Sequence, residues 1–274
     1  MNSDDPIIRL RNVHKSLDGQ VVLDGVSLDV LPGQTTVVIG PSGCGKSVLL
    51  KHIVVLMRPD RGEVHFHGRL ISSMGERQLV AVRRRMGLLF QAGALFDSMT
   101  VEQNICFPMA EHGVGTAGER RRRCREVLSL VGLDGLQGRF PAELSGGQQK
   151  RVALARAIVL DPEVILYDEP TTGLDPIRAD LINELILKLQ DALGTTAVVV
   201  THDMASARKV GDRIVMLHGG RFIADTTPDR LDELGDPVVT GFVHGHAGRD
   251  ELERIEAGRE MFRHARAADT EDRP

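Results

Sequence analysis

The chain has 274 residues, 42% of them hydrophobic, which suffices for the packed core of one large α/β domain or two small ones and excludes a largely disordered chain. The formal net charge of −4 excludes a general electrostatic attraction to nucleic acid, and the arginine clusters at 83–85 and 120–123 are interpreted as solvated helix faces. Three cysteines without a metal-binding spacing are an odd number, which argues against a disulfide framework and favours a reducing cytoplasm.

Neither a secretory signal nor a membrane span is expected. The first residues are acidic and lack the apolar region of a signal peptide. Apolar stretches such as 53–57 are far shorter than the roughly 20 residues that a membrane-spanning helix needs. We therefore expect a chain that does not cross a bilayer.

Extended patterns dominate the N-terminal part of the chain. Short strands separated by Asp-Gly and Pro-Gly turns predict an antiparallel layer, with strands at 7–10, 21–23 and 26–30. A buried strand at 35–39 follows, and a helix begins close to 48. Further strands are predicted at 62–66 and, after a basic helix, at 86–90.

The second half of the chain changes its periodicity twice. Helical patterns between 101 and 160, clearest at 119–131 and 146–160, predict a helical subdomain at about 97–160. Strands and helices then alternate, with strands at 164–167, 197–201 and 213–217 and helices at 176–193 and 204–210. This alternation predicts a parallel sheet with right-handed crossovers and ligand-binding residues at the carboxyl ends of the strands.

A phosphate-binding pattern, G-x-x-x-x-G-K-[ST], stands between the predicted strand at 35–39 and the following helix. It consists of Gly40, Pro41, Ser42, Gly43, Cys44, Gly45, Lys46 and Ser47. A helix N-terminus after a glycine-rich turn directs unpaired backbone amides and a partial positive charge at a polyphosphate. Lys46 is placed to reach the β- and γ-phosphates, and the Ser47 hydroxyl to bind Mg²⁺. The correct flanking elements make a chance match the weaker interpretation.

Two acids and a second glycine-rich helix start add to this site. Asp168 and Glu169 end an apolar strand, where Asp168 is expected to hold Mg²⁺ and Glu169 to orient or deprotonate the attacking water. Ser145, Gly146 and Gly147 open a helix and form a second anion site. One nucleotide does not need two such sites in one chain, so we expect the second to serve a facing copy of the protein.

These motifs resemble, in order and over roughly 7–235, the nucleotide-binding subunits of ABC transporters. The matching residues are the phosphate loop, Gln91, the signature segment 144–149, Asp168 with Glu169, the segment 173–175, and His202. The resemblance implies a P-loop NTPase fold of the ABC ATPase type: an α/β fold with a parallel-core sheet, an antiparallel β layer and a helical subdomain. It implies ATP and Mg²⁺ as cofactors.

The resemblance also implies roles for several residues whose positions in the sequence do not by themselves indicate a function. Gln91 reads Mg²⁺ and couples to the membrane partner, and His202 holds the γ-phosphate. Ser145 and Gly147 bind the γ-phosphate of the opposite subunit, and Asp175 bridges across a homodimer that encloses the nucleotide. Taken alone, Gln91 is typical of a surface residue and His202 of a structural one.

Within that family, residues 89–101 resemble the Mla/Mce lipid-transport ATPases. This resemblance implies an integral-membrane permease that handles phospholipid or other hydrophobic cargo, with the ATPase on the cytoplasmic face of the inner membrane. An Mce-type substrate-binding protein and a small cytoplasmic regulator are further expected partners; nucleic acid is not one. Phe90, Leu95, Phe96 and Met99 are candidates for a groove that accepts a permease helix, although packing within the subdomain is the favoured interpretation for Phe90.

The nucleotide-binding domain is expected at 1–236 and a C-terminal extension at 237–274. After a flexible stretch at 245–248, the extension shows a charged helical pattern at 250–267 with a thin apolar stripe. The stripe consists of Leu252, Ile255 and Phe262. An interaction tail and a solvated tail are equally compatible with this pattern.

Two residues depart from what the family usually has. Leu17 stands where an aromatic ring usually stacks on adenine, so we expect weak discrimination between ATP and GTP. Cys44 lies in the phosphate loop, and the helix N-terminus is expected to lower its thiol pKa and make it reactive.

Three alternatives compete with the lipid-transport hypothesis. The first is the ATPase of another transport system, such as an amino-acid importer. The second is a soluble ABC protein acting on nucleic acid or ribosomes, which the short interval between Lys46 and Ser145 and the single domain disfavour. The third is a binding module without hydrolysis, which the presence of Glu169 disfavours.

Overall fold

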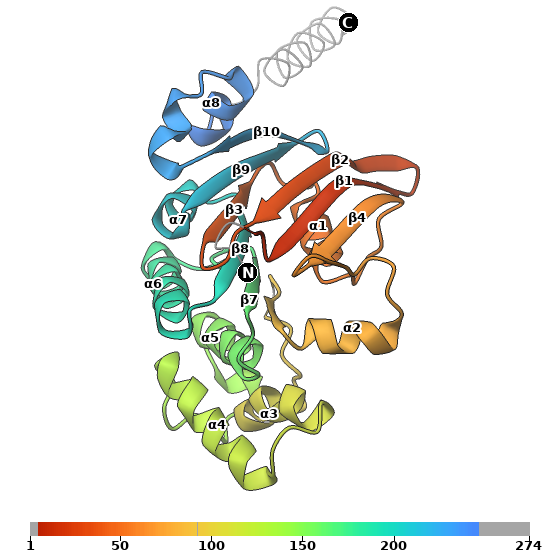
Figure 1. Cartoon of the computed structure of the whole chain (residues 1–274). Helices are drawn as coiled ribbons and strands as arrows, with labels where there is room; N and C mark the ends of the chain where they lie inside the picture. Colours follow the sequence, from red (N-terminus) through yellow and green to blue (C-terminus); the bar gives the residue numbers. More distant parts are fainter. Residues whose placement is uncertain (1–4, 92, 247–274) are drawn as a thin grey trace, which may run out of the picture. The chain divides into compact units, whose positions relative to one another are not determined.

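The computed structural model describes residues 5–91 and 93–246 (Figure 1). The chain divides into two compact units, 1–229 and 230–274, which are described separately. The predicted boundary after residue 236 falls within the second unit, and the division into a nucleotide-binding domain and an extension stays a prediction. None of the helices in the described ranges is long and apolar enough to cross a membrane.

The first unit contains a six-stranded, mainly parallel sheet in the order β10-β9-β3-β8-β7-β6. Its strands are β3 (Thr35–Ile39), β6 (Met86–Leu89), β7 (Val164–Asp168), β8 (Thr196–Thr201), β9 (Arg213–His218) and β10 (Arg221–Thr226). Strands β3, β7 and β8 are buried along their whole length, which explains their continuous apolar runs. The parallel sheet that the sequence predicts is confirmed, and β10, which pairs antiparallel with β9, is an addition to it.

A second, antiparallel sheet has the order β2-β1-β4-β5. Its strands are β1 (Ile8–Leu17), β2 (Gln20–Val30), β4 (Arg61–Phe66) and β5 (Arg69–Leu70). The two strands predicted at 21–23 and 26–30 are one strand, β2, whose pairing with β1 is irregular. Gly25, with φ of 74°, bends the strand without ending it, so the apparent break in the pattern is a local irregularity.

The helices of the first unit follow these strands. They are α1 (Lys46–Ile53), α2 (Glu76–Arg83), α3 (Val101–Glu111), α4 (Ala117–Leu130), α5 (Gly146–Ile158), α6 (Pro176–Leu193) and α7 (Met204–Val210), with the 3-10 turn η1 (Pro141–Glu143) before α5. Reciprocal side-chain caps fix the starts of α3 at Thr100 and α4 at Thr116. Figure 1 shows α3, α4 and α5 grouped together, away from the antiparallel sheet. They form the predicted helical subdomain.

The main core fixes α1 between the two sheets. Leu49, Leu50 and Ile53 of α1 are buried in one cluster with residues of β1, β2 and β4 and with one face of the parallel sheet. Each such side chain stabilises the fold by about 1.5–3 kcal/mol. On the opposite face of that sheet, Val37 packs at the end of α7, against Gly211. The buried core therefore holds α1, and with it the N-terminus of this helix, in place.

The second unit is described as far as residue 246. It contains the end of η2 (Pro228–Glu233) and α8 (Pro237–Val243), which Asp236 caps by accepting hydrogen bonds from the amides of Val238 and Val239. The helix predicted at 250–267, with its stripe of Leu252, Ile255 and Phe262, lies outside the described residues.

Candidate active site

A cavity of about 340 Å³ lies where strands β3, β6, β7 and β8 end. Its lining residues are Leu17, Val22, Ser42, Gly43, Gly45, Lys46, Ser47, Val48, Gln91, Glu169 and His202. They come from the antiparallel sheet, the phosphate loop and the segments that follow β6, β7 and β8. The fold thus gathers residues that are up to 185 positions apart at one edge of the sheet, as parallel strands require.

The phosphate loop has a backbone that glycine alone can adopt at its start. Gly40 has φ of 151°, and a Cβ atom there would lie 2.3 Å from the carbonyl oxygen of Leu217. Gly45, with φ of 105°, precedes α1 and gives it no side-chain cap. The first backbone amides of α1 therefore have no side-chain acceptor at the cap position and are directed toward the cavity.

Lys46 is buried and points its ammonium back along the loop. Its Nζ donates hydrogen bonds to the carbonyl oxygens of Gly40, at 2.8 Å, and Pro41, at 3.0 Å, and lies 3.6 Å from Oε1 of Glu169. The charge is thus held at the mouth of the loop, where a phosphate group can replace these partners.

Asp168 lies behind the loop, at the end of β7. The Ser47 hydroxyl donates to its Oδ1 at 2.8 Å. Burial raises the pKa of the Asp168 carboxyl, and the neighbouring Glu169 raises it further, whereas the Ser47 hydrogen bond and the nearby lysines lower it. The site therefore places a buried carboxylate and a hydroxyl side by side and favours a cation at this point.

Glu169 combines an unusual backbone conformation with a carboxylate that two other side chains contact. Its backbone has φ of 50°, in the left-handed region that a non-glycine residue adopts only where the surroundings enforce it. The carboxylate Oε2 accepts a hydrogen bond from the Thr172 hydroxyl at 3.1 Å and lies 2.9 Å from Nδ1 of His202. Thr172 was not singled out from the sequence, because its role depends on how the chain turns after β7.

Gln91 follows β6 and lines the same cavity with an exposed side chain. Two residues shortly after it are held by a side chain of α5. Arg156 donates hydrogen bonds to the carbonyl oxygens of Gly93, at 2.9 Å, and Ala94, at 2.8 Å. Helix α5 thus holds the two residues that lie two and three positions after Gln91.

A second group of predicted residues lies outside this cavity. Ser145 caps α5 by accepting from the amide of Gln148, whose side chain in turn accepts from the amide of Ser145. Asp175 caps α6 and pairs with Arg178, which in turn lies against Gly147. Ser145 and Gly146 are exposed. The signature segment and Asp175 therefore form one surface, separate from the cavity lined by Lys46.

One expectation about the loop is wrong. Burial raises the pKa of the Cys44 thiol above its ordinary value, and the nearby Lys46 only partly offsets this. The helix N-terminus does not make this thiol acidic, because the side chain is packed against the loop and the core. That burial depends on contacts made across the fold, which no local sequence pattern predicts.

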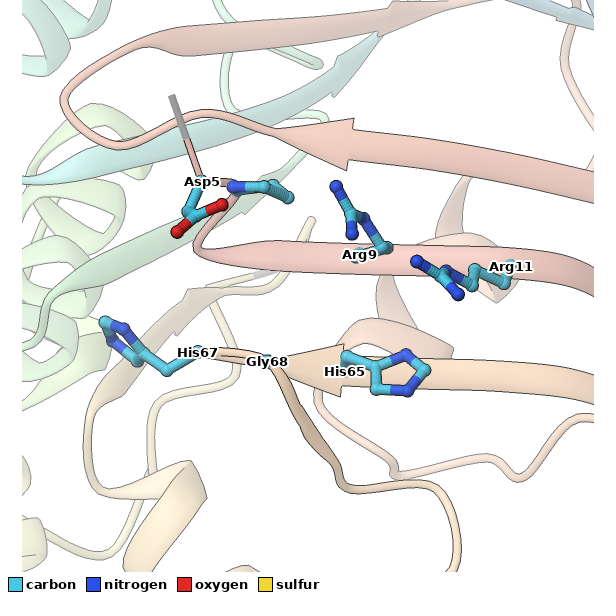
Figure 2. Close-up of a pocket in the computed structure, with 7 residues that line it drawn as sticks. Asp5, Arg9, Arg11, His65, His67 and Gly68 are labelled. Carbon is cyan, nitrogen blue, oxygen red and sulfur yellow. The ribbon is translucent and has the colours of Figure 1, made fainter. Parts of the chain in front are cut away.

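Another hollow lies on the outer face of the antiparallel sheet (Figure 2). Arg9 and Arg11 of β1 and His65 of β4 line it, as Figure 2 shows. Arg9 forms a two-point ion pair with Asp29, at 2.6 and 3.0 Å, and Asp5 also faces the hollow. The charges of Asp5 and Asp29 balance those of the two arginines, so the hollow has no surplus charge from these residues.

A phosphate loop that follows the parallel strand β3, together with two successive acids at the end of β7, defines a nucleoside triphosphatase of the P-loop class. Comparison with known proteins narrows this class. The chain matches the family model described as ABC transporter over residues 23–172. The chain belongs to the ABC transporter family, as an ATP-hydrolysing, ATP-binding subunit.

Relatives in two groups of bacteria are similar over most of the chain. The intermembrane phospholipid transport system ATP-binding protein MlaF of Haemophilus influenzae is 39% identical over 88% of this chain and 91% of its own length. The protein of that name from Escherichia coli K12 is also 39% identical, over 88% and 90%. The ribonucleotide transport ATP-binding protein mkl of Mycobacterium leprae is 40% identical, over 87% and 69%.

Solved structures agree with the fold. The ATP-binding cassette MJ0796, in a dimeric post-hydrolysis state bound to ADP and phosphate, has a TM-score of 0.75 at 35% identity and covers 81% of this chain and 98% of its own. The cbiO1 protein of Clostridium perfringens, part of the ABC transporter complex cbiONQ, has a TM-score of 0.77 at 28% identity and covers 94% and 100%.

Proposed function

We propose that this chain hydrolyses MgATP in a homodimer and thereby energises a separate membrane permease for phospholipid or other hydrophobic cargo. The observation that supports the catalytic part most strongly is the meeting of Lys46, Glu169 and His202 in one cavity. The similarity to MlaF over nearly its whole length supports the lipid part.

In the proposed reaction, Glu169 accepts a proton from the attacking water. Its carboxylate is buried, and Thr172 and His202 hold it at 3.1 and 2.9 Å. Lys46 and the loop amides bind the β- and γ-phosphates, and His202, about half exposed, is free to reach the γ-phosphate from the other side. The protein thus acts by positioning water and phosphate.

Mg²⁺ fits the oxygen ligands beside the loop. Ser47 and Asp168 present a hydroxyl and a carboxylate 2.8 Å apart, and the side chain of Gln91 lines the same cavity. Oxygen donors of this kind are those that Mg²⁺ prefers. When bound, the ion would neutralise charge on the phosphates.

The proposed dimer follows from the separation of the two groups of residues. Ser145 and Gly146 are exposed and Gly147 is buried against Arg178, and none of the three lines the cavity that holds Lys46. In the proposed arrangement, each cavity is closed by the signature segment of the other copy. The dimeric state of the cassette MJ0796 with ADP and phosphate supports this arrangement.

The proposed permease contact lies beside Gln91. Phe90, for which the sequence favours packing within the subdomain, is 38% exposed, and Phe96 is 40% exposed. Phe96 is supported by Phe107 and Arg156. An amphipathic permease helix can cover such side chains. We place this contact on the cytoplasmic face of the inner membrane and propose that an Mce-type substrate-binding protein and a small regulator belong to the complex.

The relatives differ in the cargo that their names indicate. The name of the mkl proteins refers to ribonucleotide transport, whereas the name of MlaF refers to phospholipid transport. A tagged full-length chain purified from detergent-solubilised membranes should retain a permease, and phospholipid should co-purify in molar amounts. A permease of the amino-acid type, or a complex without phospholipid, would overturn the lipid assignment and leave the ATPase intact.

Glu169→Gln tests the catalytic part. We expect kcat to fall by about 10²- to 10³-fold, because water activation is lost, while ATP affinity changes by less than about threefold. Steady-state ATP hydrolysis and equilibrium ATP binding by the full-length chain measure the two effects. Unchanged turnover would move the general base to another residue.

A further inference from the structure

Lys150 is a buried cation that the proposed reaction does not use. It lies on α5, five residues after Ser145, and only 9% of it is exposed. Burial lowers the pKa of its ammonium, and the proximity of Glu169 opposes this effect. A buried lysine costs stability unless its hydrogen bonds are made, so the partners of Lys150 show what its position provides.

Those partners are two carbonyl groups in the turn that follows Glu169. The Nζ of Lys150 donates to the oxygen of Pro170 at 2.9 Å and to that of Thr172 at 2.5 Å. The hydroxyl of the same Thr172 donates to Glu169. Lys150 is thus connected through a single residue, Thr172, to the Glu169 carboxylate that we propose as the general base. It makes this connection from α5, the helix that begins with the signature segment.

Glu169 requires such a fixed turn. Its left-handed backbone, with φ of 50°, is held only if the surrounding contacts outweigh its conformational strain. On the other side of the turn, the Thr171 hydroxyl reaches the carboxylate of Asp203 at 3.5 Å, a long contact that holds less firmly. The Ser206 hydroxyl also donates to the Thr171 hydroxyl, at 3.4 Å, and both of these partners follow β8. The two bonds from Lys150 instead join this turn to α5 and the helical subdomain.

We propose that Lys150 is a positioning residue that fixes the Glu169 carboxylate relative to the signature segment of the same chain. This rests on the proposed role of Glu169. In the proposed dimer, the signature segment of one chain contacts the nucleotide that the other chain holds. A shift of α5 caused by that contact then moves the 170–172 turn, and Lys150 connects the state of one nucleotide site to the general base of the other.

Arg151 provides a matched control on the same helix. It also donates to two carbonyl groups, those of Val131 and Gly132, both at 3.1 Å, and burial also lowers its pKa. Its partners belong to the turn after α4, away from Glu169. Removing either cation leaves two carbonyl oxygens without their donor, so both changes should lower thermal stability, and only one should affect Glu169.

The test compares Lys150→Met, Lys150→Arg and Arg151→Met in the full-length chain, with Glu169→Gln as the reference for the proposed function. We expect Lys150→Met to lower kcat by about tenfold with ATP affinity within about twofold, and to reduce the Hill coefficient for ATP toward 1. Lys150→Arg should recover most of kcat, and Arg151→Met should keep kcat within about twofold.

A double-mutant cycle with Thr172→Val shows whether Lys150 acts through this turn. If it does, the double variant should be several-fold more active than the product of the two separate losses predicts. Equal losses in Lys150→Met and Arg151→Met, additive losses in the cycle, or an unchanged kcat in Lys150→Met would each overturn the proposal. If Glu169→Gln also keeps its activity, it is the role of Glu169 that has failed.

Discussion

The two glycine-rich helix starts of this chain, those of α1 and α5, look alike in sequence and differ in structure. The start of α1 has no side-chain cap, lies inside a cavity and rests on a buried core. The start of α5 is capped by Ser145 and Gln148, with Ser145 and Gly146 exposed. Amides left without a side-chain acceptor and held rigidly form a preformed anion site, whereas a capped, exposed helix start needs another surface to complete it.

The largest difference between the two helix starts is expected in the free energy of unfolding when a methyl group is added to a glycine at each of them. Gly40→Ala places a Cβ atom 2.3 Å from the Leu217 carbonyl oxygen, at a φ that alanine rarely adopts, and should lower the free energy of unfolding by about 3 kcal/mol. Gly146→Ala meets open space and should change it by less than about 0.5 kcal/mol. Urea unfolding measures both.

The same pair of variants separates binding from hydrolysis. Gly146→Ala should bind ATP as the unaltered chain does and hydrolyse it more slowly, because the exposed start of α5 serves the partner's nucleotide in the proposed dimer. Equal destabilisation by the two changes would contradict the difference between the two helix starts.

A smaller effect is expected from acid, through His52 on α1. Its ring is fully buried, Nδ1 lies 2.7 Å from the Val48 carbonyl oxygen, and burial lowers its pKa below the ordinary 6.5. Because the folded-state pKa is the lower one, the contribution of neutral His52 to stability is complete above pH 6.5 and is lost as the pH falls below it. The slope is at most about 1.4 kcal/mol per pH unit.

Unfolding of the unaltered chain and of His52→Gln at several pH values below 7 measures this contribution. The variant should lose that part of the acid sensitivity, whereas His218→Gln, at an exposed position at the end of β9, should keep it. An unchanged pH dependence in His52→Gln would show that protonation of His52 does not contribute to the loss of stability in acid.

The smallest effect concerns the base of the nucleotide. Leu17 and Val22 line the cavity where an aromatic ring is usual, so the chain should prefer ATP over GTP only weakly. Leu17→Phe should tighten ATP binding by about threefold, as competition binding can measure. A strong preference for ATP that Leu17→Ala leaves unchanged would show that another residue selects the base.

The sequence predicts what depends on periodicity and short motifs. The buried strands β3, β7 and β8, the long helix α6 and the residues that line the cavity after each strand follow from apolar runs and from the order of the motifs. Contacts made across the fold do not. Lys150 and Thr172 are unremarkable in the sequence because their roles depend on how the turn after β7 meets α5.

The error about Cys44 has the same origin. A helix N-terminus lowers a thiol pKa only where the thiol remains hydrated, and here burial has the larger effect. The sequence likewise predicts two strands, at 21–23 and 26–30, where the structure has the single strand β2, and only its pairing with β1 shows that the strand continues.

The proposal that the cavity is half a site can be tested most directly by mixing two inactive chains. Ser145→Arg blocks the signature segment and keeps Glu169, whereas Glu169→Gln keeps the signature segment. If each site combines the cavity of one chain with the signature segment of the other, a mixed dimer contains one intact site. Random exchange of subunits should then restore ATP hydrolysis, to at most about a quarter of the unaltered rate if the two sites are coupled as proposed for Lys150. If all the residues of a site belonged to one chain, the mixture would stay as inactive as its components.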